Sequence, residues 1–379
     1  LNGFFAFAIY DADKESLFIA RDRYGIKPLY WTELDGKFHF ASELRGLFPF
    51  GISKELDRCS LAMLIQLTYI PAPWTIFKGS QKLLPGHCIE VDRSGVRVHK
   101  YYDPREEKTQ VNLNGDVESN LSELLDRSVE RRLISDVPLG SFLSGGIDSS
   151  IIAFIGAEKV KGFKTFSIGF PDHPKYDESA YAEHVARHIG SDHTTFPILE
   201  KDLRDEFFNV IDHLDEPFAD SSSIPVYVLS KRTRQHITVA LSGDGADEVF
   251  SGYNKHLAEY KMRVGGLKTT IVRGLGPLWT LFAGSRSSRT GDLFRKLDRF
   301  ATSAWKSPGD RYWFLASFTS PERVRQLLND PDHDKELGDR LSRTMAVQDP
   351  RSLDALLLND IMNVLPNDML KKVDLMSMA

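Results

Sequence analysis

The sequence predicts an α/β protein in which a doubly wound parallel sheet with a helical C-terminal part follows an antiparallel, sheet-rich region. Three observations predict this arrangement. Short apolar segments separated by turns fill the first hundred residues, apolar segments alternate with helical patterns from about residue 120 to 241, and only helical patterns follow residue 255. Alternating strands and helices are typical of a parallel sheet covered on both faces. The length of 379 residues is enough for about two or three domains.

The N-terminal region is predicted to be a meander of short strands. Strands are expected at 4–10, 17–20, 29–31 and 37–41. Turns between them are predicted at Asp11-Ala12-Asp13, Arg23-Tyr24-Gly25 and Leu34-Asp35-Gly36. A helix over 61–67 and a closing hairpin over 88–91 and 96–99 follow. Residues 1–105 are expected to form one domain.

A second domain is expected at 118–379, after a polar linker over 106–117. It opens with apolar residues at helical spacing, namely Leu121, Leu124, Leu125, Val129 and Leu133. Strands are then expected at 137–143, 164–168, 194–198 and 237–241. The helices between them are expected from residue 149 and at 178–189, 203–214 and 224–234.

Composition argues against nucleic-acid and membrane partners. The formal net charge of −5 gives no electrostatic case for nucleic acid. Residues 255–306 are an exception, with eleven Lys/Arg against three Asp/Glu. We interpret this stretch as a solvated helical face, with a nucleic-acid surface as the alternative. No apolar run approaches the roughly 20 residues that span a bilayer, since Gly276 and Pro277 interrupt the best candidate, 275–283.

The two cysteines, Cys59 and Cys88, lack the spacing of a metal site and are interpreted as small buried apolar residues. A reducing cytoplasm is therefore the expected compartment. The sequence begins inside an apolar run without Met and stops inside a helical pattern, so we interpret it as a fragment of a longer protein. The oligomeric state stays open, and a homodimer is one arrangement.

The strongest chemical signal is Ser144-Gly145-Gly146-Ile147-Asp148-Ser149, between a predicted strand and a predicted helix. Adjacent glycines let the backbone close around an anion, and the N–H groups of the turn and of the helix start point towards it. Asp148 would repel phosphate, so its presence indicates a bridging Mg²⁺. The lysine and glycine spacing of a P-loop are missing. A purely structural tight connection is the alternative interpretation.

A second acidic glycine turn, Ser242-Gly243-Asp244-Gly245-Ala246-Asp247-Glu248, also follows a strand and precedes a helix. Loops at the carboxyl ends of parallel strands face one crevice, so we expect the two turns to converge on one ligand. Asp148 and Asp247 would then hold metal on a polyphosphate, and Asp244 would add a carboxylate for positioning or proton transfer.

The first turn resembles the pyrophosphate-binding loop of the N-type ATP pyrophosphatase superfamily. Flanking motifs are similar to glutamine-hydrolysing asparagine synthetases: Ser135-Asp136-Val137-Pro138-Leu139-Gly140, Phe166-Ser167-Ile168-Gly169-Phe170, Tyr176-Asp177-Glu178-Ser179, Asp215-Glu216-Pro217 and Gly252-Tyr253. Near the N-terminus, Gly3-Phe4-Phe5-Ala6-Phe7-Ala8, Ala20-Arg21-Asp22-Arg23-Tyr24-Gly25, Lys27-Pro28-Leu29-Tyr30 and Ala41-Ser42-Glu43 resemble the later part of a class II glutamine amidotransferase domain. The closing residues, 368–379, resemble the family's helical synthetase region.

The resemblance implies a fold and a site. Residues 1–105 would be the C-terminal part of an N-terminal-nucleophile (αββα) glutaminase domain, and 118–379 an ATP-binding synthetase domain truncated at its C-terminus. The pyrophosphate would be held by Ser144, Gly145, Gly146, Ile147, Asp148 and Ser149, with Asp148 and Asp247 on Mg²⁺. The remaining ATP contacts would come from Leu143 and Ile168, around adenine and ribose, and from Ser242 and Gly243. Asp244 occupies a position where the family has Glu or Asp and would act in forming the aspartyl-adenylate.

The implied reaction converts L-aspartate to L-asparagine. The aspartate side-chain carboxylate attacks the α-phosphate of ATP, pyrophosphate leaves, and ammonia from L-glutamine then displaces AMP. The family's catalytic N-terminal cysteine has no counterpart in this stretch, so we do not expect these residues to hydrolyse glutamine by themselves.

Other interpretations stay open at this point. A related acyl-adenylating amidotransferase or a β-lactam synthetase-like enzyme would differ only in its acyl pocket, and a nucleotide-binding non-enzyme would lack turnover. Three accessory motifs also have structural interpretations. Arg21-Asp22 could be a strand-edge ion pair, Asp215-Glu216-Pro217 a helix stop, and Lys371, Lys372 and Asp374 a solvated helix face.

Overall fold

The computed structural model describes residues 1–379 except 107–115, 283–288 and 330–332. The described chain divides into two compact units, each assembled from separate stretches of sequence. Unit 1 comprises Leu1–Pro104, Glu216–Ala219 and Asp247–Asp368, and unit 2 comprises Arg105–Asp215, Asp220–Ala246 and Met369–Ala379. Most of the predicted linker, 106–117, lies outside the described residues.

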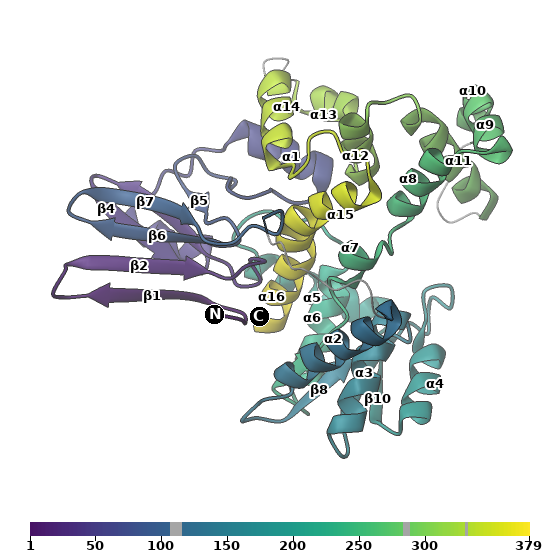
Figure 1. The fold of residues 1–379 in the computed structure, drawn as a ribbon, viewed down its shortest axis with the longest axis horizontal. Helices are drawn as coiled ribbons and strands as arrows, with labels where there is room; N and C mark the ends of the chain where they lie inside the picture. Colours follow the sequence, from purple (N-terminus) through teal and green to yellow (C-terminus); the bar gives the residue numbers. More distant parts are fainter. Residues whose placement is uncertain (107–115, 283–288, 330–332) are drawn as a thin grey trace. The chain divides into compact units, whose positions relative to one another are not determined.

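Two antiparallel sheets form the N-terminal part of unit 1 (Figure 1). The first has the order β1-β2-β6-β7, with bounds Ala6–Asp11, Ser16–Arg21, His87–Asp92 and Gly95–Lys100. The second has the order β4-β3-β5, with bounds Lys37–Ala41, Tyr30–Leu34 and Gln81–Lys82. Ile19 of β2 lies opposite Ile89 of β6, and both pack with Leu29 and Leu83 in a buried cluster. The predicted antiparallel, sheet-rich region is confirmed.

The rest of unit 1 is helical, as the pattern beyond residue 255 predicts. Its elements are η1 (Leu44–Phe50), α1 (Arg58–Leu67), α7 (Ala246–Phe250), α8 (Asn254–Val264), α9 (Leu267–Gly274), α10 (Gly276–Phe282), α11 (Arg289–Ser303), α12 (Pro308–Ala316), α13 (Pro321–Leu328), α14 (His333–Thr344), α15 (Leu353–Met362) and the π-helical turn η2 (Leu365–Met369). Side-chain caps at Asp57, Ser307, Ser320 and Ser352 begin α1, α12, α13 and α15. Each cap oxygen accepts an N–H group that the helix itself leaves without a partner.

Unit 2 contains a four-stranded sheet in which every neighbouring pair is parallel. Its order is β10-β9-β8-β11, with bounds Asp192–Pro197, Lys164–Gly169, Leu139–Phe142 and Val239–Leu241. Ser141 of β8 lies beside Thr165 of β9 on one side and Leu241 of β11 on the other. The predicted parallel sheet is confirmed.

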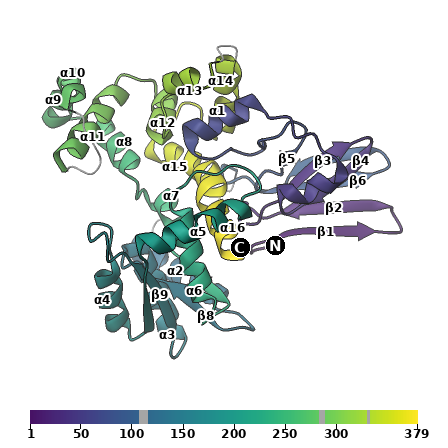
Figure 2. The same cartoon turned by 180° about the vertical axis from the view of Figure 1, so that it is seen from behind.

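Helices cover both faces of this sheet (Figures 1 and 2). One face carries α2 (Val117–Arg132), α3 (Ile147–Lys159) and α4 (Ser179–Ile189), and the other carries α5 (Glu200–His213), α6 (Ser223–Thr233) and α16 (Leu370–Met378). The first group buries Val129, Ile155 and Phe163, and the second buries Val210, Tyr227, Val228 and Met376. An apolar layer on each face is what a doubly wound sheet requires.

One boundary differs from the prediction in a way that matters for the site. Helix α3 begins at Ile147, two residues before the predicted start at 149. Gly145 adopts a left-handed backbone with φ +84°, and Gly146 follows as the helix cap. Because these two glycines complete the reversal, Ile147 and Asp148 already lie in the first helical turn.

Candidate active site

The first glycine turn joins β8 to α3, and its backbone path requires glycine. Besides its positive φ, Gly145 has backbone atoms of Tyr181 and Ala182 only 2.6 Å from the position that a Cβ would take. The hydroxyl oxygens of Ser144 and Ser149 lie 3.0 Å apart, and Ser149 Oγ accepts the Ser144 N–H at 3.2 Å. Both hydroxyl groups are therefore held over the same turn.

Helix α3 begins without a side-chain cap. Its N-cap is Gly146, which has no side chain to accept the N–H groups of the first turn. These N–H groups have no acceptor within the helix, and the positive end of the helix dipole lies there. Ser144 and Ile147 are solvent-exposed, and Asp148 is half-buried in the same turn. The start of α3 is thus suited to bind an anion such as a phosphate group.

The second glycine turn packs directly against the start of α3. Strands β8 and β11 are parallel neighbours, so both turns leave the sheet at the same edge. A Cβ on Gly243 would lie 2.9 Å from Ser149 N and 3.0 Å from Asp148 Cβ. The structure therefore brings Gly243 onto the first turn of α3. In the same loop, Ser242 is half-buried and Asp244 is exposed.

The donor chemistry fits a magnesium ion shared with a polyphosphate. Mg²⁺ prefers oxygen ligands and commonly binds through one or two carboxylates together with substrate phosphates. Asp148 supplies one such carboxylate in the first turn of α3, and the role of Asp247 as a second ligand stays a prediction. Within the described residues, no group of three or more His, Cys, Asp or Glu side chains could hold a metal without such a substrate.

Leu143 and Ile168 pack in different apolar clusters. Leu143 is 1% exposed and contacts Ala153, Ala182 and Ala186 of α3 and α4. Ile168, at the end of β9, is half-buried against the cluster around Tyr227 on the α5, α6 and α16 face. The predicted contacts of these two residues with adenine and ribose stay predictions.

Glu216, from Asp215-Glu216-Pro217, is buried in unit 1. Its carboxylate pairs with Lys82 of β5 and accepts the Ile76 N–H at 3.2 Å. Neither side chain is more than 7% exposed, and Lys82 also donates to the Ile70 carbonyl at 2.8 Å. Glu216 therefore anchors residues 216–219 within unit 1, which favours the structural interpretation of this motif.

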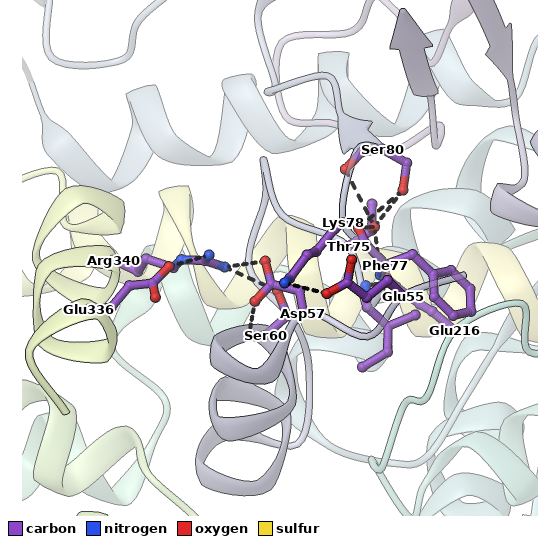
Figure 3. A network of polar contacts seen from close by, with 11 residues as sticks. Glu55, Asp57, Ser60, Thr75, Phe77, Lys78, Ser80, Glu216, Glu336 and Arg340 are labelled. Carbon is purple, nitrogen blue, oxygen red and sulfur yellow. Dashed lines mark hydrogen bonds and ion pairs between the residues drawn. The ribbon is translucent and has the colours of Figure 1, made fainter. Parts of the chain in front are cut away.

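A pocket of about 190 Å³ adjoins this anchor, lined by Asp57, Pro73, Trp74, Thr75, Phe77, Lys78, Gly79, Ser80 and Gln81. Its charged groups pair with protein side chains, as Figure 3 shows. Arg340 donates to Asp57 at 2.9 Å, and Lys78 lies 2.6 Å from Glu55. The first contact joins α14 to the N-cap of α1 and the second joins two loop segments, so we assign this polar network a structural role.

The prediction of a solvated face is wrong for Lys372. Its side chain is 8% exposed and its Nζ lies 2.9 Å from Asp220 Oδ2, where α16 packs on α6. Burial alone would raise the pKa of Asp220, but the Lys372 charge and hydrogen bonds from Ser222 hold it below its usual value. Helical periodicity alone could not distinguish this buried lysine from a solvated one.

Arg21 and Asp22 organise a turn of the N-terminal region. Arg21 is buried and donates to the carbonyls of Lys27, Gly25 and Leu83, with the first two at 2.7 and 2.8 Å. Asp22 accepts the N–H groups of Tyr24, Ile26 and Lys27. Both side chains thus fix residues 22–27, which favours a structural role.

Both cysteines are buried free thiols, as predicted. Burial raises the pKa of Cys59 to about 12, which makes its thiolate scarce at neutral pH. No helix among the described residues is long and apolar enough to cross a membrane.

Two known families match the N-terminal and the C-terminal part of the chain separately. Residues 1–102 match the family of glutamine amidotransferase domains, and residues 120–379 match the asparagine synthase family. The chain belongs to the asparagine synthase family. This membership confirms the resemblance on which the site predictions depend.

Several relatives are moderately similar to the chain. Asparagine synthetase 1 (glutamine-hydrolyzing) of Bacillus subtilis is 35% identical over 67% of this chain and 40% of its own length. A putative asparagine synthetase 2 of Methanocaldococcus jannaschii is 32% identical over the full chain and 72% of its own length. The amidase chyE of Penicillium rubens is 32% identical over 68% of this chain and 41% of its own length. The aligned region thus spans less than half of the first of these relatives.

Sequence reasoning missed a buried polar cluster in the family's helical region. Asp360 of α15 is 0% exposed and accepts hydrogen bonds from Lys255, His256 and Tyr312. Glu248, also 0% exposed, accepts one from Tyr253. Glu248 ends the second glycine-turn motif and Tyr253 follows it by five residues in the sequence, which was an available signal that they are functionally relevant. Nothing in the local sequence marks Asp360.

Proposed function

We propose that the whole protein is a glutamine-dependent asparagine synthetase. It would convert L-aspartate, ATP and ammonia from L-glutamine into L-asparagine, AMP and pyrophosphate. The observation that carries the proposal is the packing of Gly243 on the first turn of α3, which joins two glycine turns at one sheet edge. Family membership and relatives named as asparagine synthetases support it.

The residues of the first turn would bind the leaving pyrophosphate. The uncapped start of α3 and the two serine hydroxyls supply donors that do not need to reorganise as charge develops. Ser242 and Gly243 would contact ATP from the second turn. Asp244, which is exposed beside it, would position the aspartate substrate for attack on the α-phosphorus.

Asp148 and Asp247 would hold the metal. A bound Mg²⁺ would neutralise phosphate charge during departure of pyrophosphate. The domain assignment is part of the proposal: 1–105 would be glutaminase, 106–117 linker and 118–379 synthetase. The two buried free cysteines support a reducing cytoplasm as the compartment.

The second candidate is an acyl-adenylating amide-forming enzyme with another carboxylic acid as substrate. It is favoured by relatives named as amidases, including chyE and chry2 of Gibberella zeae. Both candidates use the same ATP site, so only the acid that drives pyrophosphate release distinguishes them.

Pyrophosphate release by the full-length protein tests the proposal. We expect release to require ATP and L-aspartate, with L-asparagine as the product. The Asp148→Asn variant should lose at least about 100-fold in rate, the scale for losing one group that stabilises transition-state charge. Asp192→Asn, an exposed change in β10, is the matched control and should retain the activity. Release driven by another acid would favour the second candidate, and ATP binding without AMP formation would contradict both.

A further inference from the structure

Asp360 is the centre of a buried polar network within unit 1. Its Oδ1 accepts hydrogen bonds from Lys255 Nζ at 2.7 Å and from the Tyr312 hydroxyl at 2.9 Å. Its Oδ2 accepts one from His256 Nε2 at 2.6 Å. Both Asp360 and His256 are 0% exposed. Three donors fix the position of this buried carboxylate, because the loss of any one of them leaves a buried polar group without a hydrogen bond.

The network fixes the start of α8. His256 Nδ1 accepts the Tyr253 N–H at 3.4 Å, so the ring proton belongs on Nε2, which donates to Asp360. Tyr253 is the N-cap residue of α8, and its N–H thus bonds to the third residue of that helix. Asp360 therefore holds the loop 251–253 through His256 and Lys255.

Tyr253 carries this restraint back to α7. Its hydroxyl donates to Glu248 Oε1 at 2.5 Å. Glu248 is 0% exposed, and its other oxygen has no hydrogen-bond partner among the described residues. The tyrosine hydroxyl is therefore the side-chain contact that fixes Glu248, the residue next to Asp247.

The same loop closes on the Asp247 carboxylate. A Cβ on Gly252 would lie 1.7 Å from Asp247 Oδ1, and the Gly252 N–H donates to the Asp247 carbonyl at 3.0 Å. A side chain at 252 and the present Asp247 rotamer are therefore mutually exclusive. The carboxylate orientation depends on where this loop lies.

We propose that Asp360 is a positioning residue for Asp247, acting through His256, Tyr253 and Glu248, with Gly252 leaving the space that the Asp247 carboxylate occupies. The inference rests on the proposed function, in which Asp247 binds magnesium. In this inference, the magnesium dependence of the enzyme depends partly on Asp360. That residue lies more than a hundred residues from Asp247 in the sequence and does not itself contact metal or substrate.

Two measurements on full-length variants test this inference. The variants are Asp360→Asn, Tyr253→Phe and Gly252→Ala, and Asp354→Asn on the exposed side of α15 is the matched control. Hydrogen–deuterium exchange of peptides covering 246–256 reports the restraint without any ligand. Calorimetric titration of ATP at a series of Mg²⁺ concentrations reports how well the Asp247 carboxylate is positioned to bind the metal.

We expect faster exchange over 246–256 in Asp360→Asn and Tyr253→Phe but not in Asp354→Asn. The Mg²⁺ concentration for half-maximal ATP binding should rise about 10- to 100-fold in all three test variants, the range for losing a residue that orients a metal ligand. A folded Tyr253→Phe variant with unchanged exchange would overturn the inference, even if Asp360→Asn fails to fold. So would a folded Gly252→Ala variant with unchanged Mg²⁺ dependence. Wild-type protein that binds ATP independently of Mg²⁺ would instead refute the metal role in the proposed function, and the inference with it.

Discussion

Replacing Gly243 with alanine introduces one methyl group between the two glycine turns. That methyl would lie 2.9 Å from Ser149 N and 3.0 Å from Asp148 Cβ, whereas ordinary contacts begin at 3.4 Å. The turns must therefore separate by about 0.5 Å (3.4 minus 2.9) or more. Both neighbouring atoms belong to the first turn of α3, where they cannot move as freely as the end of a long side chain.

Two effects of different size should follow. Overpacking of this kind costs about 1–3 kcal/mol of unfolding free energy. Displacing groups around a reacting ligand by about 1 Å can cost about 100-fold in rate, so we expect a 10- to 100-fold loss in kcat/KM for ATP. We expect the variant to stay folded at the assay temperature, so the loss in rate should exceed what destabilisation explains.

Urea denaturation and pyrophosphate-release kinetics of the full-length protein measure these two quantities. Gly338→Ala is the matched control, since a Cβ there meets nothing within 4 Å in the helix α14. It should stabilise the protein by up to about 1 kcal/mol and leave kinetics unchanged, because alanine is favoured over glycine within a helix. A folded Gly243→Ala variant with wild-type ATP affinity and rate would refute the reasoning that the two turns form one site.

Three further predictions concern residues outside the proposed ATP site. Lys82→Met leaves the buried Glu216 carboxylate without its cation, so the unfolding free energy in urea should fall by about 3–5 kcal/mol; a fall below 1 kcal/mol would contradict the assignment of this anchor. Lys372 keeps the pKa of folded Asp220 below its unfolded value, so their pair adds stability above the unfolded pKa that disappears as pH falls through the folded pKa. Asp220→Asn should therefore flatten the acid limb of stability against pH, and parallel acid limbs would disprove the effect. Cys59, whose pKa burial raises to about 12, should resist iodoacetamide at pH 8 until the protein unfolds, and rapid alkylation of the native protein would show that it is accessible.

Local sequence patterns were sufficient to predict an antiparallel region, a parallel sheet and the first glycine turn, but not that β1-β2-β6-β7 and β4-β3-β5 form two separate antiparallel sheets. The alternation of apolar segments and helical patterns predicted a parallel sheet, although not its strand order, and Gly145-Gly146 marked the reversal between β8 and α3. The start of α3 was misplaced by two residues because Ile147 and Asp148 look like a continuation of the turn. Capping geometry, which needs φ and ψ, decides this boundary.

Long-range polar pairing could not be predicted from local patterns. Lys82 and Glu216 are 134 residues apart, and neither carries a sequence signal for the other. Asp360 lies in a helix without any recognisable motif, yet it accepts hydrogen bonds from Lys255, His256 and Tyr312. Such pairs depend on which elements pack together, and that is fixed by the whole fold.

Transfer of an oxygen atom from substrate to product tests the central claim most directly. The full-length protein should be supplied with ATP, ammonia and L-aspartate labelled with ¹⁸O in its side-chain carboxylate, and the AMP analysed by mass spectrometry. Attack of the carboxylate on the α-phosphorus, followed by displacement of AMP by ammonia, leaves one labelled oxygen in AMP and one in asparagine. We predict one ¹⁸O atom per AMP formed, whereas unlabelled AMP alongside labelled asparagine would contradict the proposed aspartyl-adenylate.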